Sequence, residues 1–228
     1  MDTTRQVKSK KRVADHGEVF TAAREVNAML DLVKNETERI DSRFLEPACG
    51  TGNFLVEILN RKLKVVTARY KRNQSEWERY CFIAVSSIYG VDILEDNCVE
   101  CRKRLFDIVD GVYKKLYNKK TTDTFRASIK FLFEKNIIWG DALTMKQVGK
   151  GKENEPITFS EWSAVNGTNI KRRDYTLSHL LETAKYDEPN QPGLLAADKT
   201  KAIPRPVAEY TMCHYLRVAD AEKTEVCA

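Results

Sequence analysis

The sequence predicts an α/β fold built on a parallel, doubly wound sheet with flanking helices. Three short apolar segments each end at an acidic residue, a glycine turn follows the first of them, and helical segments separate them along the chain. This alternation of strands and helices is typical of parallel sheets. The chain has 228 residues, of which 42% are hydrophobic, so it can form one well-packed domain.

The N-terminal region begins with a charged segment. Residues 1–15 contain few large apolar side chains, which indicates a flexible basic arm before a domain spanning 16–228. Two interpretations of its basic cluster stay open, a solvated tail and an arm that contacts phosphate. The cluster consists of Lys8, Lys10, Lys11 and Arg12. Over 22–34 the apolar residues recur at helical spacing and predict a core-facing helix. They are Val26, Met29, Leu30 and Val33.

The first βα unit follows. Residues 43–46 predict a strand, and Gly50 and Gly52 predict a tight turn before a helix. The predicted core face of this helix carries Leu55, Ile58, Leu59 and Leu63. Such a unit is typical of ligand binding, because the first N–H groups of the helix are free. A dinucleotide fingerprint is disfavoured, since Leu55 replaces its third glycine and the next strand-end acid comes only at Asp92.

Two more units complete the predicted sheet. A helix from Ser75 precedes a strand over 87–93, and helices over about 95–116 and 125–133 precede a strand over 136–141. The inner face of the longer helix carries Leu105, Ile108, Val109, Val112 and Leu116. Because parallel strands share their carboxyl edge, Glu46, Asp92 and Asp141 should lie together. Carboxylates there can accept hydrogen bonds from hydroxyl groups and an exocyclic amine, which adenosine presents.

These motifs resemble those of the amino-group DNA methyltransferases, especially the N6-adenine enzymes of restriction-modification systems. The segment Glu46–Phe54 (EPACGTGNF) is very similar to motif I of that family. Gly17–Thr21 resembles motif X, although Ala22 stands where the family usually has proline. Residues 89–93 (YGVDI) and 139–143 (WGDAL) are similar to the second and third cofactor motifs. The resemblance covers about residues 12–145, in the order that places motif X first, and residues 146–228 diverge.

The resemblance implies a Rossmann-like class I fold that binds S-adenosylmethionine (SAM). Thr21, Glu46 and the loop Gly50, Thr51 and Gly52 would hold the methionine portion. Asp92 would bind the ribose hydroxyls, Asp141 the adenine amine, and Phe54 and Ile93 would supply the apolar surroundings of the adenine.

The implied function is that of a SAM-dependent DNA methyltransferase specific for adenine N6, or of the modification subunit of a restriction-modification or defence system. DNA is the expected partner, together with a specificity, restriction or second methyltransferase subunit. The net charge of +5 suits a polyanionic partner without reaching the charge density of a nucleic-acid clamp. A membrane is not expected as a partner, because no apolar run approaches the roughly 18–20 residues that span a bilayer, and a cytoplasmic location is expected.

The catalytic motif departs from the family. Asn, Asp or Ser followed by Pro-Pro and an aromatic residue should close the fourth strand, yet the sequence contains no Pro-Pro dipeptide. The fourth-strand candidate, 156–159, leads into Ser160, Glu161 and Trp162. Ser160 and Trp162 are therefore the candidate catalytic residues of a divergent motif. The alternative is a catalytically silent SAM-binding partner or regulatory protein, such as a shortened methyltransferase relative.

The remaining segments give weaker signals. The C-terminal third lacks a clear period and is expected to be irregular, with one closing strand over 210–218. Cys98 and Cys101 have metal or redox spacing, but they fall in a helical pattern without a second pair, so packed thiols are favoured and no metal is expected. The segment Lys171–Arg173 is either a solvated loop or a phosphate contact.

Overall fold

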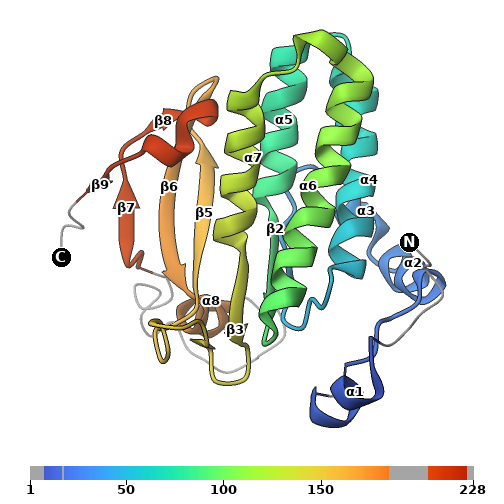
Figure 1. Cartoon of the computed structure of the whole chain (residues 1–228). Helices are drawn as coiled ribbons and strands as arrows, with labels where there is room; N and C mark the ends of the chain where they lie inside the picture. The colour runs from blue at the N-terminus through green and yellow to red at the C-terminus, as the bar shows by residue number, and fades with distance from the viewer. Residues whose placement is uncertain (1–7, 17, 185–204, 225–228) are drawn as a thin grey trace, which may run out of the picture.

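The fold is mixed α/β and Rossmann-like, with three parallel strands at its centre. The computed structural model describes residues 8–16, 18–184 and 205–224 (Figure 1). Strands β1 (Phe44–Glu46), β2 (Ile88–Asp92) and β3 (Ile137–Asp141) pair in that order, and the short β4 (Lys146–Gln147) pairs antiparallel with β3. The three predicted parallel strands are thereby confirmed.

Two helices make up each crossover between the parallel strands. Helices α4 (Asn53–Tyr70) and α5 (Gln74–Ser86) connect β1 to β2, and α6 (Glu95–Tyr117) and α7 (Asp123–Asn136) connect β2 to β3. These four helices pack side by side (Figure 1). Ile88 of β2 packs in their core cluster, whereas Tyr89 and Val91 pack in another, with residues of the C-terminal region. Within the described residues, the doubly wound arrangement is therefore a wrong prediction, because a second sheet and the start of one short helix at Leu177 pack there in place of a second helix layer.

The second sheet is formed by the C-terminal third. Strands β5 (Thr158–Ala164) and β6 (Asn169–Thr176) form an antiparallel hairpin, which β7 (Ala208–Tyr210), β8 (Cys213–His214) and β9 (Lys223–Thr224) extend. The described part of the C-terminal third is thus regular rather than irregular as expected, whereas 185–204 lie outside the described residues. The single closing strand over 210–218 is wrong too, since Tyr215–Asp220 form the 3-10 helix η3. Helix α8 (Leu177–Ala184) follows β6.

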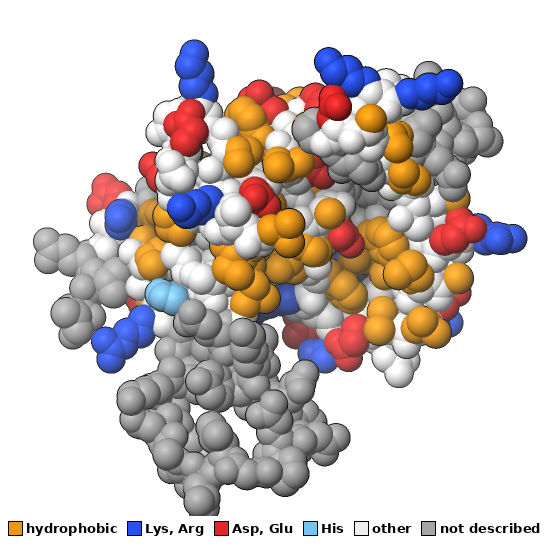
Figure 2. Space-filling view, turned by 90° about the horizontal axis from the view of Figure 1, so that it is seen from below, with side chains coloured by type: hydrophobic (Ala, Val, Ile, Leu, Met, Phe, Trp, Pro, Cys, Tyr) orange, Lys and Arg blue, Asp and Glu red, His pale blue; other side chains and the backbone are white. Residues whose placement is uncertain are grey.

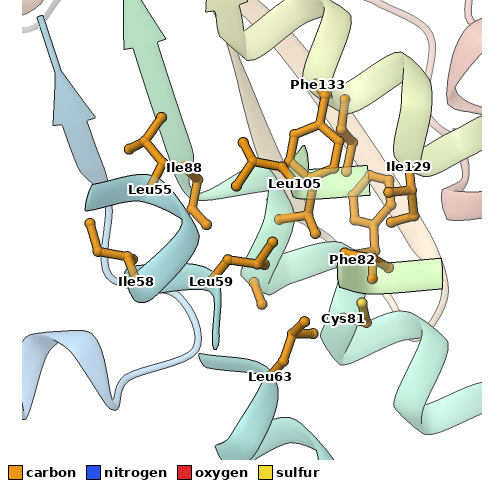
Figure 3. Packing of buried hydrophobic residues seen from close by; sticks show 14 of the residues in the cluster. Leu55, Ile58, Leu59, Leu63, Cys81, Phe82, Ile88, Leu105, Ile129 and Phe133 are labelled. Atoms are coloured by element: carbon orange, nitrogen blue, oxygen red, sulfur yellow. The ribbon is translucent and has the colours of Figure 1, made fainter. Parts of the chain in front are cut away.

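Helix α4 carries the core face that its apolar spacing predicts. Leu55, Ile58, Leu59 and Leu63 are all buried and point into the packed helices and strands (Figure 3). On α6, Leu105 and Val109 are buried, and Ile108, Val112 and Leu116 pack against the core while partly exposed. Apolar spacing therefore identified the core side of both long helices.

The N-terminal helices differ from the sequence expectation. Within the segment expected to be a flexible arm, residues Lys10–His16 form helix α1. Helix α2 spans Ala23–Asp31 and is followed by the short α3 (Lys34–Thr37). Val26 and Leu30 are buried as predicted, but Met29 and Val33 are exposed. Helix α2 contacts the domain along α4. Val33 does not share its core face, because the helix ends before this residue.

A buried glutamate ties the C-terminal region to the helices. Glu78 of α5 accepts hydrogen bonds from the hydroxyls of Tyr113 and Tyr215, the latter at 3.2 Å. Ser128 of α7 also donates to the backbone carbonyl of Tyr215 at 2.5 Å. These bonds fix η3 on the helix layer.

No helix within the described ranges is both long enough and apolar enough to cross a membrane.

Lys62 is a fully buried lysine that positions the start of the sheet, and burial lowers its pKa to about 7. Its ammonium group donates to the backbone carbonyls of Arg39, Ile40 and Ser42 at 3.1, 3.0 and 2.6 Å, and to the Ser87 hydroxyl at 2.9 Å. The side chain therefore joins α4 to the segments that lead into β1 and β2.

We expect Lys62→Met to lower the free energy of unfolding by roughly 1–3 kcal/mol, because it leaves buried carbonyls without a donor. Lys64→Met is the matched control, since Lys64 is exposed on the same helix and its replacement should change stability by less than about 0.5 kcal/mol. Urea denaturation followed by circular dichroism measures both. Equal effects of the two substitutions would contradict this role of Lys62.

Candidate cofactor site

The carboxyl ends of the three parallel strands meet at one edge of the sheet. Glu46 of β1 is in register with Gly90 of β2, and Asp92 of β2 with Trp139 of β3. Glu46, Asp92 and Asp141 therefore end neighbouring strands, as the sequence predicted. Figure 2 looks onto this edge of the molecule.

The glycine loop after β1 requires glycine at two positions. Gly50 has φ +51° and Gly52 has φ +89°, in the left-handed region that other residues rarely adopt. A Cβ atom at Gly52 would lie 2.6 Å from the Cys101 sulfur, and one at Gly50 would lie 3.1 Å from the Phe20 ring. Gly52 is also the N-cap of α4, so the loop leads directly into a helix N-terminus.

The side chain of Asp92, at the end of β2, is hydrogen-bonded to the glycine loop. Its Oδ2 accepts the Gly50 N–H at 2.8 Å, and its Oδ1 accepts the Leu94 N–H at 2.9 Å and the Asn97 side-chain amide at 3.1 Å. The carboxylate is buried. A carboxylate offers about four lone-pair positions, so Asp92 keeps acceptor capacity for a ligand donor.

Thr21 and Thr51 are held at the start of α4. The Asn53 side-chain amide donates to the Thr21 carbonyl at 3.0 Å. Arg104 of α6 donates to the Thr51 carbonyl and hydroxyl at 2.6 and 2.9 Å and to Asn53 Oδ1 at 3.0 Å. The segment around Thr21 thus reaches the glycine loop. Sequence reasoning missed Phe20, Asn53 and Arg104 as parts of this site, and nothing in the helical pattern of α6 distinguishes Arg104.

The other predicted cofactor residues surround these groups. Burial raises the pKa of half-buried Glu46, against the effect of a hydrogen bond from the Ala48 N–H. Asp141 accepts the Leu143 N–H at 2.9 Å and thereby shapes the turn after β3. Ile93 is exposed at the edge, whereas Phe54 packs partly against the helix core.

The surface around the strand ends is mixed in character. Ile93 and Leu143 are exposed apolar residues there, with Leu143 94% exposed. Figure 2 shows hydrophobic side chains across the middle of this face and most Lys and Arg side chains towards its outline. Carboxylates beside apolar surface suit a small ligand with amine or hydroxyl groups and an apolar part.

Ser160 and Trp162 lie in β5 of the second sheet. The Ser160 side chain is 2% exposed, and its hydroxyl donates to Asp174 at 2.7 Å and accepts from Arg172 at 3.0 Å. The Trp162 indole donates to Asn136 Oδ1 at 3.2 Å. The expected placement at the end of a fourth parallel strand is therefore wrong, because β5 runs on to Ala164 and pairs antiparallel with β6. Their catalytic role stays a prediction.

The cysteine pair of α6 has a packing role. Cys98 and Cys101 are buried in α6, which confirms the packed-thiol interpretation, and burial raises the pKa of Cys98 to about 12. Within the ranges that the structure describes, no group of three or more His, Cys, Asp or Glu residues is placed to hold a metal ion.

The basic segment 171–173 lies in β6 rather than in a loop. Lys171 and Arg173 form ion pairs with Glu209 at 2.9 and 3.4 Å, and Arg172 pairs with Asp174 at 2.8 Å. Each cation thus has a carboxylate partner within the sheet. The solvated-loop interpretation is wrong, and the phosphate contact stays a prediction.

A Rossmann-like sheet with a glycine loop and three acids at its carboxyl edge defines a class of α/β domains that bind a cofactor at this edge. The family model of the MmeI DNA-methyltransferase domain matches residues 20–155, and the chain belongs to this family of restriction-modification DNA methyltransferases. The matched region contains β1 to β4 and ends before β5. Neither a curated protein nor a solved structure gives a match.

Substitution by alanine should have opposite effects on stability at Gly52, in the loop, and at Gly111, inside α6. Gly52→Ala should lower the free energy of unfolding by roughly 1–3 kcal/mol, since alanine is strained at positive φ and its methyl group would displace the buried Cys101 side chain. Gly111→Ala should raise it by roughly 0.5–1 kcal/mol, because Gly111 lies inside α6 with open space around it. Thermal and urea unfolding measure both. A neutral Gly52→Ala would show that the loop does not depend on this conformation.

Proposed function

We propose that this chain is the SAM-binding part of a DNA methyltransferase that modifies the N6 amine of adenine. The observation that carries the proposal is the register of β1, β2 and β3, which brings Glu46, Asp92 and Asp141 to the edge that holds the glycine loop. Membership of the MmeI methyltransferase-domain family supports it. SAM would supply an activated methyl group on its sulfonium.

The donor and acceptor groups at the edge match the parts of SAM. Asp92 would bind the ribose by accepting from one hydroxyl at the acceptor position that its three protein hydrogen bonds leave. Asp141 would accept the adenine amine, and the exposed Ile93 would lie against the ring. Glu46 and the Thr21 segment would hold the methionine ammonium group, and the first N–H groups of α4, which begins directly after the Gly50–Gly52 loop, would hold its carboxylate.

The methyl acceptor requires residues that this edge does not obviously provide. The sequence has no Pro-Pro motif, and the Ser160 hydroxyl and Trp162 indole already donate to Asp174 and Asn136. We therefore favour a second methyltransferase or specificity subunit as the source of the residues that bind the flipped adenine and the DNA. The assembly would act in the cytoplasm.

A silent SAM-binding regulator is the second candidate. The same observation favours it, because a chain whose candidate catalytic groups are bonded internally can bind the cofactor without transferring a methyl group. The two candidates share the cofactor site and differ in whether a methyl group reaches DNA.

Calorimetry with SAM tests the cofactor site. Wild-type protein should bind SAM, and Asp92→Asn should weaken binding by roughly 10- to 100-fold through loss of charge-assisted hydrogen bonds. Asp107→Asn is the control, since Asp107 pairs with Lys103 on the exposed side of α6. NAD should not compete. Folded wild-type protein that fails to bind SAM would refute both the enzyme and the silent-binder candidates.

Ser160→Ala separates a packing role from a catalytic one. We expect it to lower the free energy of unfolding by roughly 1–3 kcal/mol, because Asp174 and Arg172 lose a buried partner. Ser163→Ala is the control in the same strand, where the hydroxyl accepts only a long bond of 3.5 Å from Arg173.

Transfer of a labelled methyl group from SAM to duplex DNA is measured alongside, with the label assigned after digestion to nucleosides. In a complex purified with its partner subunit, the label should appear as N6-methyladenine, and Ser160→Ala should leave transfer intact at temperatures where it is folded. A folded Ser160→Ala protein with normal SAM affinity and no transfer would instead establish Ser160 as catalytic.

A further inference from the structure

Asn97 lies at a junction of four charged groups beside the candidate cofactor site. It belongs to the first turn of α6 and is 1% exposed. Its Nδ2 donates to Asp92 at 3.1 Å and to Glu18 at 2.7 Å. Its Oδ1 accepts from Lys8 at 2.9 Å and from Arg12 at 3.1 Å. Both donors and both lone pairs of the amide are therefore used, with the N–H groups towards carboxylates and the oxygen towards cations.

Arg12 of α1 also contacts the two carboxylates of Glu18 and Asp96. Its Nη2 donates to Glu18 Oε1 at 2.7 Å, and its Nε lies 2.7 Å from Glu18 Oε2. Its Nη1 donates to Asp96 at 2.5 Å. The Glu18 side chain is only 7% exposed, so its charge requires a partner. The bond from Arg12 lowers the pKa of Asp96 to about 2.

These contacts form a continuous path from α1 to the acid at the end of β2. Without Arg12, the buried Glu18 carboxylate would face the Asp92 carboxylate through Asn97 with one fewer cation to balance it. With Arg12 in place, the Glu18 carboxylate has a cationic partner and accepts from the Asn97 amide, whose other N–H donates to Asp92. The Glu18 segment continues into Phe20 and Thr21, which contact the glycine loop and the start of α4.

We propose that Arg12 is a positioning residue of the cofactor site, which acts through Glu18 and Asn97 on Asp92. The inference rests on the proposed function, because it takes Asp92 as a SAM ligand. It assigns α1 a part in cofactor binding, although the sequence pattern indicates only a basic arm. Since coupling between two equilibria is reciprocal, SAM binding should also stabilise the docked position of α1.

Three single variants and one double variant test the path by SAM calorimetry. Asn97→Asp keeps the size of the side chain and the oxygen that accepts from Lys8 and Arg12. It replaces the N–H donor to Asp92 and Glu18 with a second oxygen, so it should weaken SAM binding at least tenfold. Arg12→Met should weaken it about three- to tenfold, and Arg12→Lys should restore part of the loss. The Arg12→Met, Asn97→Asp double variant should bind SAM no more weakly than Asn97→Asp alone, because both changes interrupt one path.

Hydrogen exchange adds a readout that a purely structural role would not move. In the wild type, SAM should slow amide exchange in residues 10–16, and Arg12→Met should abolish this protection. Lys103→Met is the control, because Lys103 lies on the same helix as Asn97 and pairs with Asp107 away from the network.

Each outcome has a distinct meaning. Wild-type SAM binding with unchanged affinity in Arg12→Met and Asn97→Asp overturns this inference and leaves the cofactor proposal standing. Additive losses in the double variant also overturn it, because they show independent effects. A folded wild-type protein that does not bind SAM overturns the proposed function and this inference with it.

Discussion

The hydrogen bond from the Gly50 N–H to the Asp92 carboxylate joins the two strand ends on which the site depends. Hydrogen bonds to an ionised acceptor are roughly twice as strong as neutral ones. The same carboxylate accepts from Leu94 and Asn97, so one buried acid sets the glycine loop, the start of α6 and the position of Asn97 together. Because Gly50 and Gly52 adopt positive φ, the loop can meet this acid while α4 begins immediately after it. A ligand that binds Asp92 therefore meets groups whose geometry is already fixed.

The second sheet supports this edge from the other face of β2. Tyr89 packs its ring against Phe159 and donates its hydroxyl to the Ser160 carbonyl at 3.0 Å. Inside the sheet, Arg172, Asp174 and Ser160 satisfy one another, and buried polar groups that are fully paired fix a unique packing. This arrangement gives the C-terminal third a scaffolding role.

The sequence predicts those parts of the structure that depend on residues close together in the chain, and it misses those that depend on distant ones. The strand ends, the glycine loop and the core face of α4 are local patterns, and Leu55, Ile58, Leu59 and Leu63 are buried as expected. The second sheet was missed because β6 buries Arg172 and Asp174, so its strand alternation is not one of apolar and polar residues. Arg12, Asn97 and Arg104 were missed as site residues because each also has a partner far away in sequence, 84 residues from Arg12 to Asp96, 79 from Asn97 to Glu18 and 53 from Arg104 to Thr51. The exposure of Val33 follows from the end of α2 at Asp31, which apolar spacing does not specify.

The proposed roles of Asp92, Asn97 and Arg12 all depend on SAM binding at the carboxyl edge of β1, β2 and β3. Photo-cross-linking with methyl-labelled SAM, followed by peptide mapping, tests it most directly. If SAM binds there, label should appear in peptides that contain 44–54, 89–97 or 139–144, and it should be lost when excess unlabelled SAM is present. Competable label confined to 158–176 or 205–224 would place the ligand on the second sheet and contradict binding at this edge.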